Sequence, residues 1–466
     1  MHESNCLSVS PVTRISGLLS IDVFLDPAGA VCEANCVGEQ FRGFEQMLKG
    51  RKITDSVYFT QRICGICSLA HGYTAARLVD QVYGVKLSPE TVLLQQAMLG
   101  AEFLQNHLRH FYLLVLPDYL PCSLSPGWAK PASDSRFDPP QTKTLVDHYF
   151  EAAVYSRKCH EMLAVFGGKI PHQHGLVPEG VAVFPSADRK LQFVSLIREV
   201  RSFIERALLP DAYLLAEVYH DYLNIGSGHP RFISFGLFDP RFGGHFPTGI
   251  YARGKILPVE FDQISQSIYH SWFKNSGGEI VPDPDKPQGY TWVKAPRYKD
   301  LAFEGGPLAR KIIRSGSEIP AFTGAMARNL ARAEEAHLIA AWVEDWVRNL
   351  PQQGEFITEL PKEPVLARAV QGNDAPRGPL LHALAARGND IASYMVITPS
   401  MWNFSPKDER GQRGPAEESL VGTGVADPAC PAEIGRIVRS FDPCLSCGTH
   451  VMEMSGKKLV DIRLQA

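Results

Sequence analysis

The spacing of apolar and polar residues predicts a few short strands near the start of the chain and long helices after them. Residues 19–25 alternate apolar and polar side chains and end at Asp26-Pro27, which predicts a strand and a turn, with a second strand at 30–36. From Ser88 onward apolar residues recur at helical spacing. Because the segment Ser88-Pro89-Glu90 combines an N-cap serine, an early proline and an early acid, we predict one long helix from there to Pro117.

Further amphipathic helices are predicted at 143–166, 187–207 and 324–350. Residues 226–305 are rich in glycine, proline and aromatic side chains, which indicates loops and small sheets. The sequence has no internal repeat and no low-complexity linker. We therefore expect an α+β fold that is predominantly α, with a large helical core and small peripheral β-sheets, in a single domain over residues 1–466.

Composition and charge exclude several classes of protein. Hydrophobic residues make up 45% of the chain and charged residues 21%, which is typical of a globular protein. The formal net charge is −3 and there is no long Lys/Arg run, so we expect no nucleic-acid binding. No secretory signal and no apolar run of about 20 residues is present, so we expect no membrane span. The prediction is a cytoplasmic protein, unless a partner subunit exports it or holds it at a membrane.

The candidate chemistry lies in two Cys-x-x-Cys pairs, one near each end of the chain. Cys64 and Cys67 form the first pair, and Cys444 and Cys447 form the second. Two thiols at this spacing can bind one soft metal, since thiolates select nickel, zinc, copper or iron-sulfur clusters over magnesium or calcium. Spacing alone leaves open a structural zinc site, a redox dithiol and plain buried thiols.

The residues around each cysteine pair favour one kind of metal site over these alternatives. RICGIC followed by His71, and DPCLSC followed by His450, resemble the paired signatures of nickel-iron hydrogenase large subunits. The resemblance covers nearly the whole chain, through PVTRI (11–15), RGFE (42–45), residues 107–118, GGKIPH (167–172), DAPRG (374–378) and PSMWN (399–403). It implies the fold of those large subunits.

The resemblance also implies a role for each cysteine. Cys64 and Cys444 match terminal nickel ligands, and Cys67 and Cys447 match the thiolates that bridge nickel to iron. The iron of this family carries carbon monoxide and cyanide. The implied cofactor is therefore a nickel-iron centre with these small ligands.

Other matched residues are expected to surround that centre. Arg377, with Pro376 before it, and Ser400 match the positions that line the pocket of the iron ligands, and Arg377 also matches the guanidinium above the open face of the metals. A surface salt bridge is the alternative for Arg377, and a helix or turn cap is the alternative for Ser400.

Two aspartates and a histidine complete the expected surroundings. Asp118 and Asp442 match carboxylates near the same arginine, although an aspartate before proline is also a common turn residue. His71 is expected to hydrogen-bond a bridging sulfur, and the alternative is a packed core histidine.

A second metal site is implied by Glu45 and His450. In the family the matching residues help to hold a buried magnesium-type ion whose shell is largely water. The alternative for Glu45 is an ion pair with Arg42.

The sequence departs from the family pattern at one functional position. Family members commonly have glutamate as a proton gate where this chain has Ser16. A carboxylate accepts and releases a proton near neutral pH, whereas a hydroxyl only relays one along a hydrogen-bond chain. We therefore expect Ser16 and ordered water to conduct the proton, or the proton to leave by another route.

Maturation of the chain and electron transfer from it both imply further proteins. Residues 451–466 match a tail that a maturation endopeptidase removes after His450 once nickel is loaded. The other cysteines form no iron-sulfur ligation pattern, so electrons must leave through a partner, which the resemblance identifies as an iron-sulfur small subunit.

The sequence thus predicts a nickel-iron hydrogenase that reversibly splits dihydrogen into protons and electrons. The first rival is a regulatory hydrogen sensor with the same centre and low turnover, which the missing glutamate favours. A non-catalytic structural subunit related to respiratory complexes and a zinc-stabilised scaffold are the other rivals.

Overall fold

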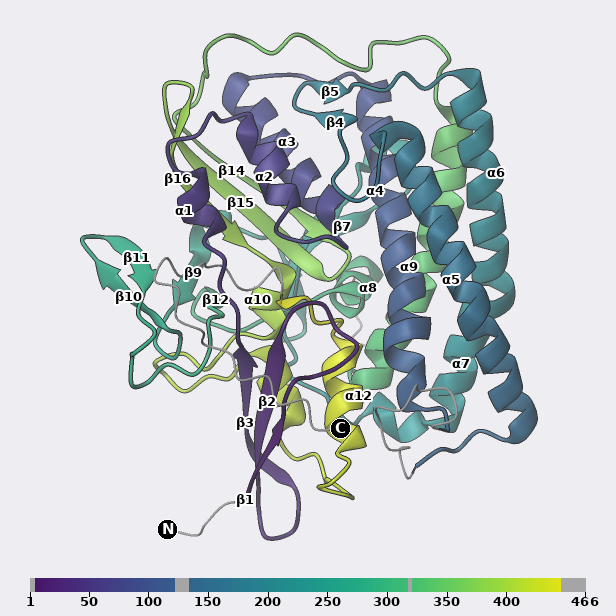
Figure 1. Cartoon of the computed structure of the whole chain (residues 1–466), viewed down its shortest axis with the longest axis vertical. Coiled ribbons are helices and arrows are strands. Elements are labelled where there is room, and N and C mark those ends of the chain that lie inside the picture. The colour runs from purple at the N-terminus through teal and green to yellow at the C-terminus, as the bar shows by residue number, and fades with distance from the viewer. Residues whose placement is uncertain (1–4, 122–133, 317–320, 446–466) are drawn as a thin grey trace, which may run out of the picture.

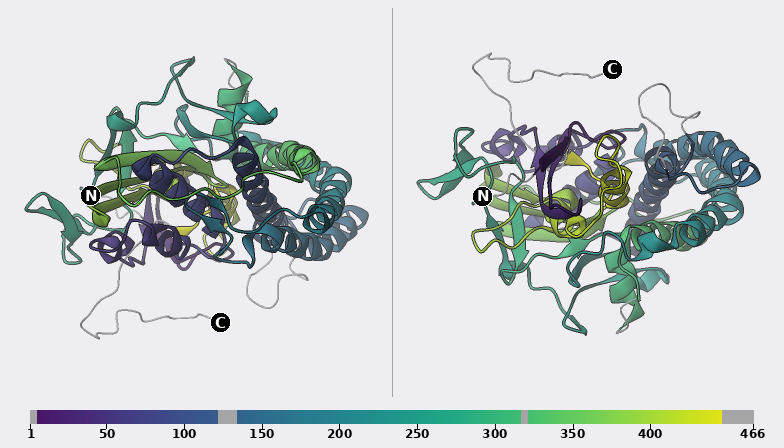
Figure 2. Two further views of the ribbon diagram at one scale, coloured as in Figure 1. Left: turned by 90° about the horizontal axis from the view of Figure 1, so that it is seen from above. Right: turned by 90° about the horizontal axis from the view of Figure 1, so that it is seen from below.

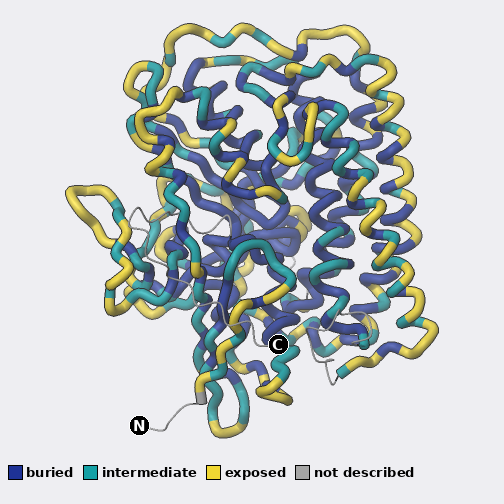
Figure 3. The backbone as a smooth tube through the Cα atoms, viewed as in Figure 1, coloured by how far each residue is buried: buried dark blue, intermediate teal, exposed yellow. Residues whose placement is uncertain are grey.

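Four long helices stand side by side and form the largest layer of the molecule (Figures 1 and 2). The chain is represented by a computed structural model that describes residues 5–121, 134–316 and 321–445. Helix α4 (Pro89–Arg109) packs between α5 (Pro139–Gly167) and α9 (Ala325–Asn349), while α6 (Ala187–Phe203) packs on α5 and α9. Helix α4 is buried along nearly its whole length (Figure 3), and its buried residues include polar as well as apolar side chains.

An antiparallel sheet of three strands lies beside this helical layer (Figure 1). It is formed by β14 (Arg368–Ala375), β15 (Gly378–Arg387) and β16 (Asp390–Ile397), in that order. Helix α3 (Ser68–Tyr83) packs on β14 and β15. The tight turn between β14 and β15 contains Pro376 and Arg377, so the sheet fixes the position of that arginine.

The remaining strands form smaller sheets. One is the antiparallel sheet β1-β2-β3, and another has the order β13-β6-β7-β8 with β13 parallel to β6. The pairs β10-β11, β12-β9 and β4-β5 are two-stranded. The bounds are β1 Asn5–Val9, β2 Leu19–Leu25, β3 Val31–Gly38, β4 Leu176–Val177, β5 Gly180–Val181, β6 Phe232–Leu237, β7 Phe246–Ala252, β8 Lys255–Leu257, β9 Ile264–Ser267, β10 Phe273–Ser276, β11 Glu279–Pro282, β12 Ala295–Tyr298 and β13 Glu304–Gly305.

Shorter helices connect these layers. Helix α12 leads directly into the second cysteine motif and lies next to the N-terminal sheet (Figure 1). The bounds are α1 Phe44–Leu48, α2 Asp55–Gln61, α7 Leu209–Val218, α8 Pro307–Ser315, α10 Pro399–Asn403, α11 Pro415–Leu420 and α12 Ala432–Ser440.

The predicted fold class is confirmed, and three element boundaries differ for local reasons. The long helix stops being α-helical at Arg109 and continues as a π-helical turn over His110–Val115. Helix α5 begins at Pro139, earlier than predicted, because Asp138 and Gln141 form a capping box. Helix α6 ends at Phe203 and passes into a second π-helical turn. The sheet β14-β15-β16 and helix α3 were not among the predicted elements.

One hydrophobic core joins both ends of the chain. It extends from Val12 to Leu445 and includes Cys64, Cys67 and Cys444 among its buried members. Within the described residues, no helix combines the length and the apolar character that crossing a bilayer requires.

Candidate metal centre

The first cysteine pair lies in a turn between α2 and α3 that nearby residues hold in place. The guanidinium of Arg42 donates to the carbonyl oxygen of Arg62 at 3.3 Å and to that of Ile63, immediately before Cys64. The backbone N–H of Ile66 donates to the sulfur of Cys64 at 3.3 Å. Such N–H···S bonds stabilise the thiolate form that binds a metal.

The second pair is held by segments from distant parts of the chain. Ser16 forms a parallel β-bridge with Cys444: its N–H donates to the carbonyl of Pro443 at 3.2 Å, and its own carbonyl accepts from the N–H of Leu445 at 2.7 Å. The N–H of Cys444 donates to the hydroxyl oxygen of Ser400 at 3.0 Å. The residue predicted as the proton relay therefore lies directly beside the backbone of Cys444.

The two motifs meet at one point inside the protein. The sulfur atoms of Cys64 and Cys444 lie 3.4 Å apart although 380 positions separate them in the sequence. The sulfurs of Cys64, Cys67 and Cys444 all lie within 4.8 Å of one another and are buried. Cys447 and His450, which the sequence analysis also assigned to metals, lie outside the described residues.

Arg377 and Asp442 form a buried ion pair beside these sulfurs. The guanidinium lies 3.0 Å from the carboxylate and also donates to the backbone carbonyl of Asp442 at 3.0 Å. Burial alone would raise the pKa of Asp442, but the charges of Arg377, His110 and Arg332 together outweigh it and lower that pKa to about 2. Asp442 also has a φ of 59°, so it serves as a turn residue and as an ion-pair partner. For Arg377, the surface salt bridge is excluded because its side chain is only 3% exposed.

Asp118 is not the second carboxylate at Arg377. Its carboxylate instead binds Arg439, with one bond of 2.5 Å and another of 2.7 Å, and it also pairs with Arg14. Burial would raise the pKa of Asp118, yet the two guanidinium groups hold it below its ordinary value. Since Arg14 precedes Ser16 and Arg439 precedes Cys444, Asp118 fastens together the two segments that pair at the site.

The place next to Asp442 is taken by an amide from α4. Asn106 donates from Nδ2 to the carboxylate of Asp442 at 2.8 Å. One turn earlier on the same helix, the buried carboxylate of Glu102 accepts the backbone N–H groups of Leu69 and Ala70 at 2.7 and 2.8 Å. Burial raises the pKa of Glu102 to about 7.

Sequence reasoning missed Asn106 and Glu102, and it gave Arg42 only the alternative role of an ion-pair partner. A usable signal was present, because Glu102 and Asn106 are polar residues four positions apart on a helix with many apolar residues. A buried polar side chain needs a partner, so this spacing predicts a shared polar neighbour.

A small cavity lies beside the sulfurs, at the position where the iron ligands were expected. Cys67, His71, Pro376, Arg377 and Ser400 line it. Ser400 lies inside α10, whose N-cap is Thr398, so it does not cap that helix, and its hydroxyl accepts the N–H of Cys444 instead.

His71 shares this cavity with the cysteines. Its hydrogen bond in the structure is with another buried histidine, since Nδ1 lies 3.2 Å from Nε2 of His382. Burial lowers the pKa of His71 to about 4, so the ring is neutral at ordinary pH.

Glu45 has a different partner from the one considered in the sequence. Its carboxylate lies 2.9 Å from the ammonium of Lys294 and accepts the N–H of Val396 at 3.0 Å. Arg42 instead donates to the backbone before Cys64, as described above.

A buried ionic network supports the turn that carries Arg377. Arg310 binds Glu335 and Asp374 and donates to the carbonyl of Pro376 at 3.0 Å. Glu335 also lies 2.9 Å from Nε2 of His107.

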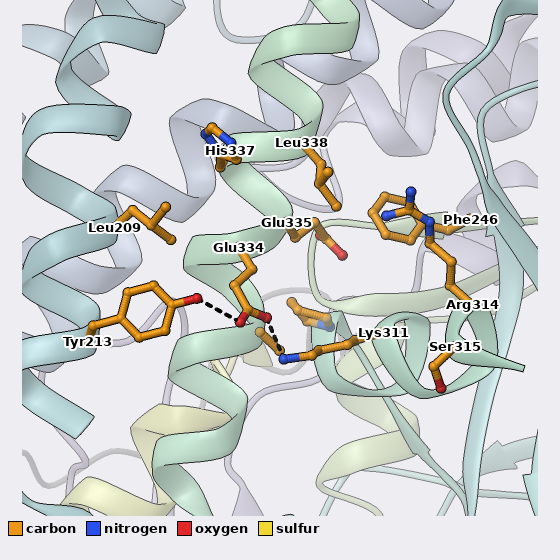
Figure 4. Close-up of a pocket in the computed structure, with 12 residues that line it drawn as sticks. Leu209, Tyr213, Phe246, Lys311, Arg314, Ser315, Glu334, Glu335, His337 and Leu338 are labelled. Atoms are coloured by element: carbon orange, nitrogen blue, oxygen red, sulfur yellow. Dashed lines mark hydrogen bonds and ion pairs between the residues drawn. The ribbon is translucent and has the colours of Figure 1, made fainter. Parts of the chain in front are cut away.

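Glu335 also lines a separate pocket of about 470 Å³ between α7, α8 and α9, drawn in Figure 4. In this pocket the carboxylate of Glu334 binds the hydroxyl of Tyr213 and the ammonium of Lys311. That pocket contains no cysteine.

The donor set fits a soft transition metal. Three buried thiols converge, one of them already accepts an N–H, and a guanidinium supplies a compensating positive charge nearby. Thiolates at such a site select soft metals over magnesium or calcium.

Comparison with known proteins gives the class. The model of the nickel-dependent hydrogenase family matches residues 42–125 and 122–450, so the chain belongs to this family. It is 35% identical to the periplasmic nickel-iron-selenium hydrogenase large subunit of Desulfomicrobium baculatum, over 96% of this chain and 95% of that one. It is 27% identical to the hydrogenase-1 large chain of Escherichia coli, over 98% and 97%.

Solved structures agree. A nickel-iron-selenium hydrogenase structure from Desulfomicrobium baculatum superposes with a TM-score of 0.90 at 35% identity, covering 96% of this chain and 100% of that chain. One from Desulfovibrio vulgaris gives 0.89 at 33% identity, with the same coverage. The present sequence has cysteine at all four positions of the two motifs.

Proposed function

We propose that this chain is the catalytic large subunit of a nickel-iron hydrogenase, which reversibly converts dihydrogen into two protons and two electrons. The observation that carries the proposal is the meeting of Cys64, Cys67 and Cys444 in a buried site beside Arg377. Membership of the nickel-dependent hydrogenase family supports a nickel-iron centre at that site.

The residues divide the work of holding that centre. We assign all four cysteines to this centre: Cys64 and Cys444 would hold nickel, and Cys67 and Cys447 would be shared between nickel and iron. The cavity beside Cys67 would hold the carbon monoxide and cyanide of the iron. When bound, the metal pair supplies the Lewis acidity that makes dihydrogen a proton donor.

The residues of the chain hold this site dry and orient its charges. Arg377 is fixed by Asp442 and by the network through Arg310, so its guanidinium is aligned before substrate enters. Its buried positive charge favours the anionic thiolates and the anionic cyanide ligands.

Proton transfer is assigned to Ser16 and ordered water. Its backbone lies beside that of Cys444, and its hydroxyl relays a proton without holding one. Ser16→Ala is expected to turn over much more slowly and Ser16→Glu to gain hydrogen-deuterium exchange. A Ser16→Ala enzyme with the wild-type rate would show that the proton leaves elsewhere.

Activity with artificial dyes separates this proposal from its rivals. The purified holoenzyme is expected to oxidise dihydrogen with a dye as acceptor and to contain nickel, whereas a sensor with the same centre shows the metals but little turnover. The sensor remains the second candidate because of Ser16, and the comparisons do not favour it over the enzyme. Stoichiometric zinc without nickel would contradict both.

A magnesium-type ion is proposed at Glu45 and His450. In the structure the ammonium of Lys294 binds the same carboxylate, so ion and ammonium compete for its oxygens. Glu45→Gln is expected to lose the ion, and an unchanged magnesium content in that variant would rule the assignment out.

Electrons are proposed to leave through an iron-sulfur small subunit. The chain resembles proteins named large subunits and large chains. Since the cysteines outside the site have no iron-sulfur ligation spacing in the sequence, we assign the electron relay to that small subunit. We propose a cytoplasmic location, with export or membrane attachment arising only through such a partner.

Maturation is proposed to remove residues 451–466. An endopeptidase would cut after His450 once nickel is bound. Intact-mass measurement of active enzyme is expected to give a chain that ends at His450, and a retained tail would refute the cleavage.

A further inference from the structure

The start of α3 is capped in an unusual way. Cys67 is its N-cap residue, and an N-cap side chain ordinarily accepts the N–H of the second or third helical residue. The thiol of Cys67 makes no such bond. The N–H groups of Leu69 and Ala70, which are the second and third residues of α3, donate to the two carboxylate oxygens of Glu102 on α4, at 2.7 and 2.8 Å.

The use of Glu102 as the acceptor in place of the N-cap side chain matters, because the N-cap residue Cys67 is assigned as a metal ligand. A thiolate immediately before a helix is attracted by the positive end of the helix dipole and by the exposed N–H groups. Each N–H···S bond withdraws electron density from the sulfur and weakens its donation to a metal. A carboxylate that accepts those N–H groups removes this competition.

Glu102 is held firmly enough to do this. Glu102 is 2% exposed, and its helix α4 packs between α5 and α9. Asn106 follows one turn later on the same helix and binds Asp442 at 2.8 Å. One face of α4 therefore contacts the segment after the first cysteine pair and Asp442, two residues before the second pair.

We propose that Glu102 is a positioning residue of the metal centre: it occupies the N–H groups at the start of α3, so that the sulfur of Cys67 is directed to the metals rather than to the helix. This inference rests on the proposed function, because it assigns Cys67 to a nickel-iron centre. It extends that function by tying the electron donation of one sulfur to a residue on another helix.

The test uses the holoenzyme and the Glu102→Gln variant. Glutamine is neutral and its amide nitrogen cannot accept an N–H, so one N–H of α3 loses its acceptor and becomes available to the sulfur of Cys67. The infrared bands of the iron-bound carbon monoxide and cyanide are expected to shift to higher frequency, because less charge reaches the iron. Turnover is expected to fall about tenfold, the usual scale for a residue that orients a metal ligand.

Glu417→Gln is the matched control. Glu417 is also fully buried, its pKa is also raised to about 7 by burial, and it accepts the backbone N–H of Cys36 at 3.0 Å. Its contacts are with β3 and Tyr290 and not with either cysteine pair. The control is expected to leave the infrared bands unchanged.

The outcomes are separable. A band shift in Glu102→Gln alone supports the proposal, and unchanged bands in a nickel-loaded Glu102→Gln enzyme overturn it. If that variant does not retain nickel, Glu102→Asp decides: it keeps the charge on a shorter side chain, so a smaller shift in the same direction is expected, and no shift overturns the proposal. Wild-type enzyme without these bands would instead contradict the nickel-iron centre itself.

Discussion

The two cysteine motifs are positioned in different ways. The first lies in a turn that is followed at once by α3, and its backbone is fixed by Arg42 and the adjacent helices. The second lies after α12 and depends on Ser16, Ser400 and Arg377, which come from three distant segments. The first is therefore a largely local structure, whereas the second forms only when the whole chain has folded.

This difference has a physical consequence for assembly. Bringing Cys444 to Cys64 closes a loop of most of the chain, and the entropy of that closure must be recovered from contacts. The contacts are buried and ionic, chiefly Arg377 with Asp442 and Asp118 with Arg14 and Arg439. Variants of the second motif should accordingly affect stability and metal together.

The largest expected effect is the loss of one converging sulfur. Cys444→Ala removes a sulfur from the buried site, and nickel is expected to be lost completely, although the first pair is intact. Cys159→Ala is the control, because Cys159 is a buried thiol in α5 outside the site. Elemental analysis of both purified variants provides the measurement. Full nickel occupancy in Cys444→Ala would show that the two motifs do not share a centre.

The next effect comes from the ion pair that holds the second motif. Arg377→Met leaves Asp442 buried without its cation, which is expected to cost about 3–5 kcal/mol of folding free energy. Adding Asp442→Asn should restore much of that stability but not activity, since the guanidinium is still missing. Thermal unfolding of the single and double variants measures this. Equal stability of all three proteins would contradict the ion pair as the main restraint.

A carboxylate remote from the sulfurs gives the pH dependence. Burial raises the pKa of Glu417 from 4.5 to about 7, so its contribution to stability is complete below pH 4.5 and is lost as the pH rises through 7. The difference corresponds to about 3 kcal/mol. The melting temperature should fall more between pH 5 and pH 8 in the wild type than in Glu417→Gln. Parallel curves would show that Glu417 titrates normally.

The smallest effect concerns the hydroxyl that binds the second motif. Ser400→Ala removes the acceptor of the Cys444 N–H at 3.0 Å, which is expected to cost about 1 kcal/mol. Nickel should be retained and turnover should fall only modestly. Ser400→Thr keeps the hydroxyl and serves as the comparison in a thermal and kinetic assay. Loss of nickel in Ser400→Ala alone would assign the serine a larger role.

The same local and long-range difference explains what the sequence revealed. Helical periodicity and caps such as Ser88 predicted the long helices, because those signals are local. The sheet β14-β15-β16 escaped prediction, since its strands are recognised by pairing. At the site, the motifs identified the cysteines and Arg377. The sequence did not indicate that Asn106 binds Asp442, or that Asp118 binds Arg439 instead. Those contacts depend on how α4 and α12 pack.

The central claim is that sulfurs from both ends of the chain bind one nickel. X-ray absorption at the nickel edge of the purified holoenzyme tests it most directly. The account predicts sulfur neighbours and iron as a near scatterer in the wild-type enzyme, and a nickel signal that is lost with either Cys64→Ser or Cys444→Ser. A nickel signal that responds to only one of these substitutions, or zinc bound in its place, would contradict it.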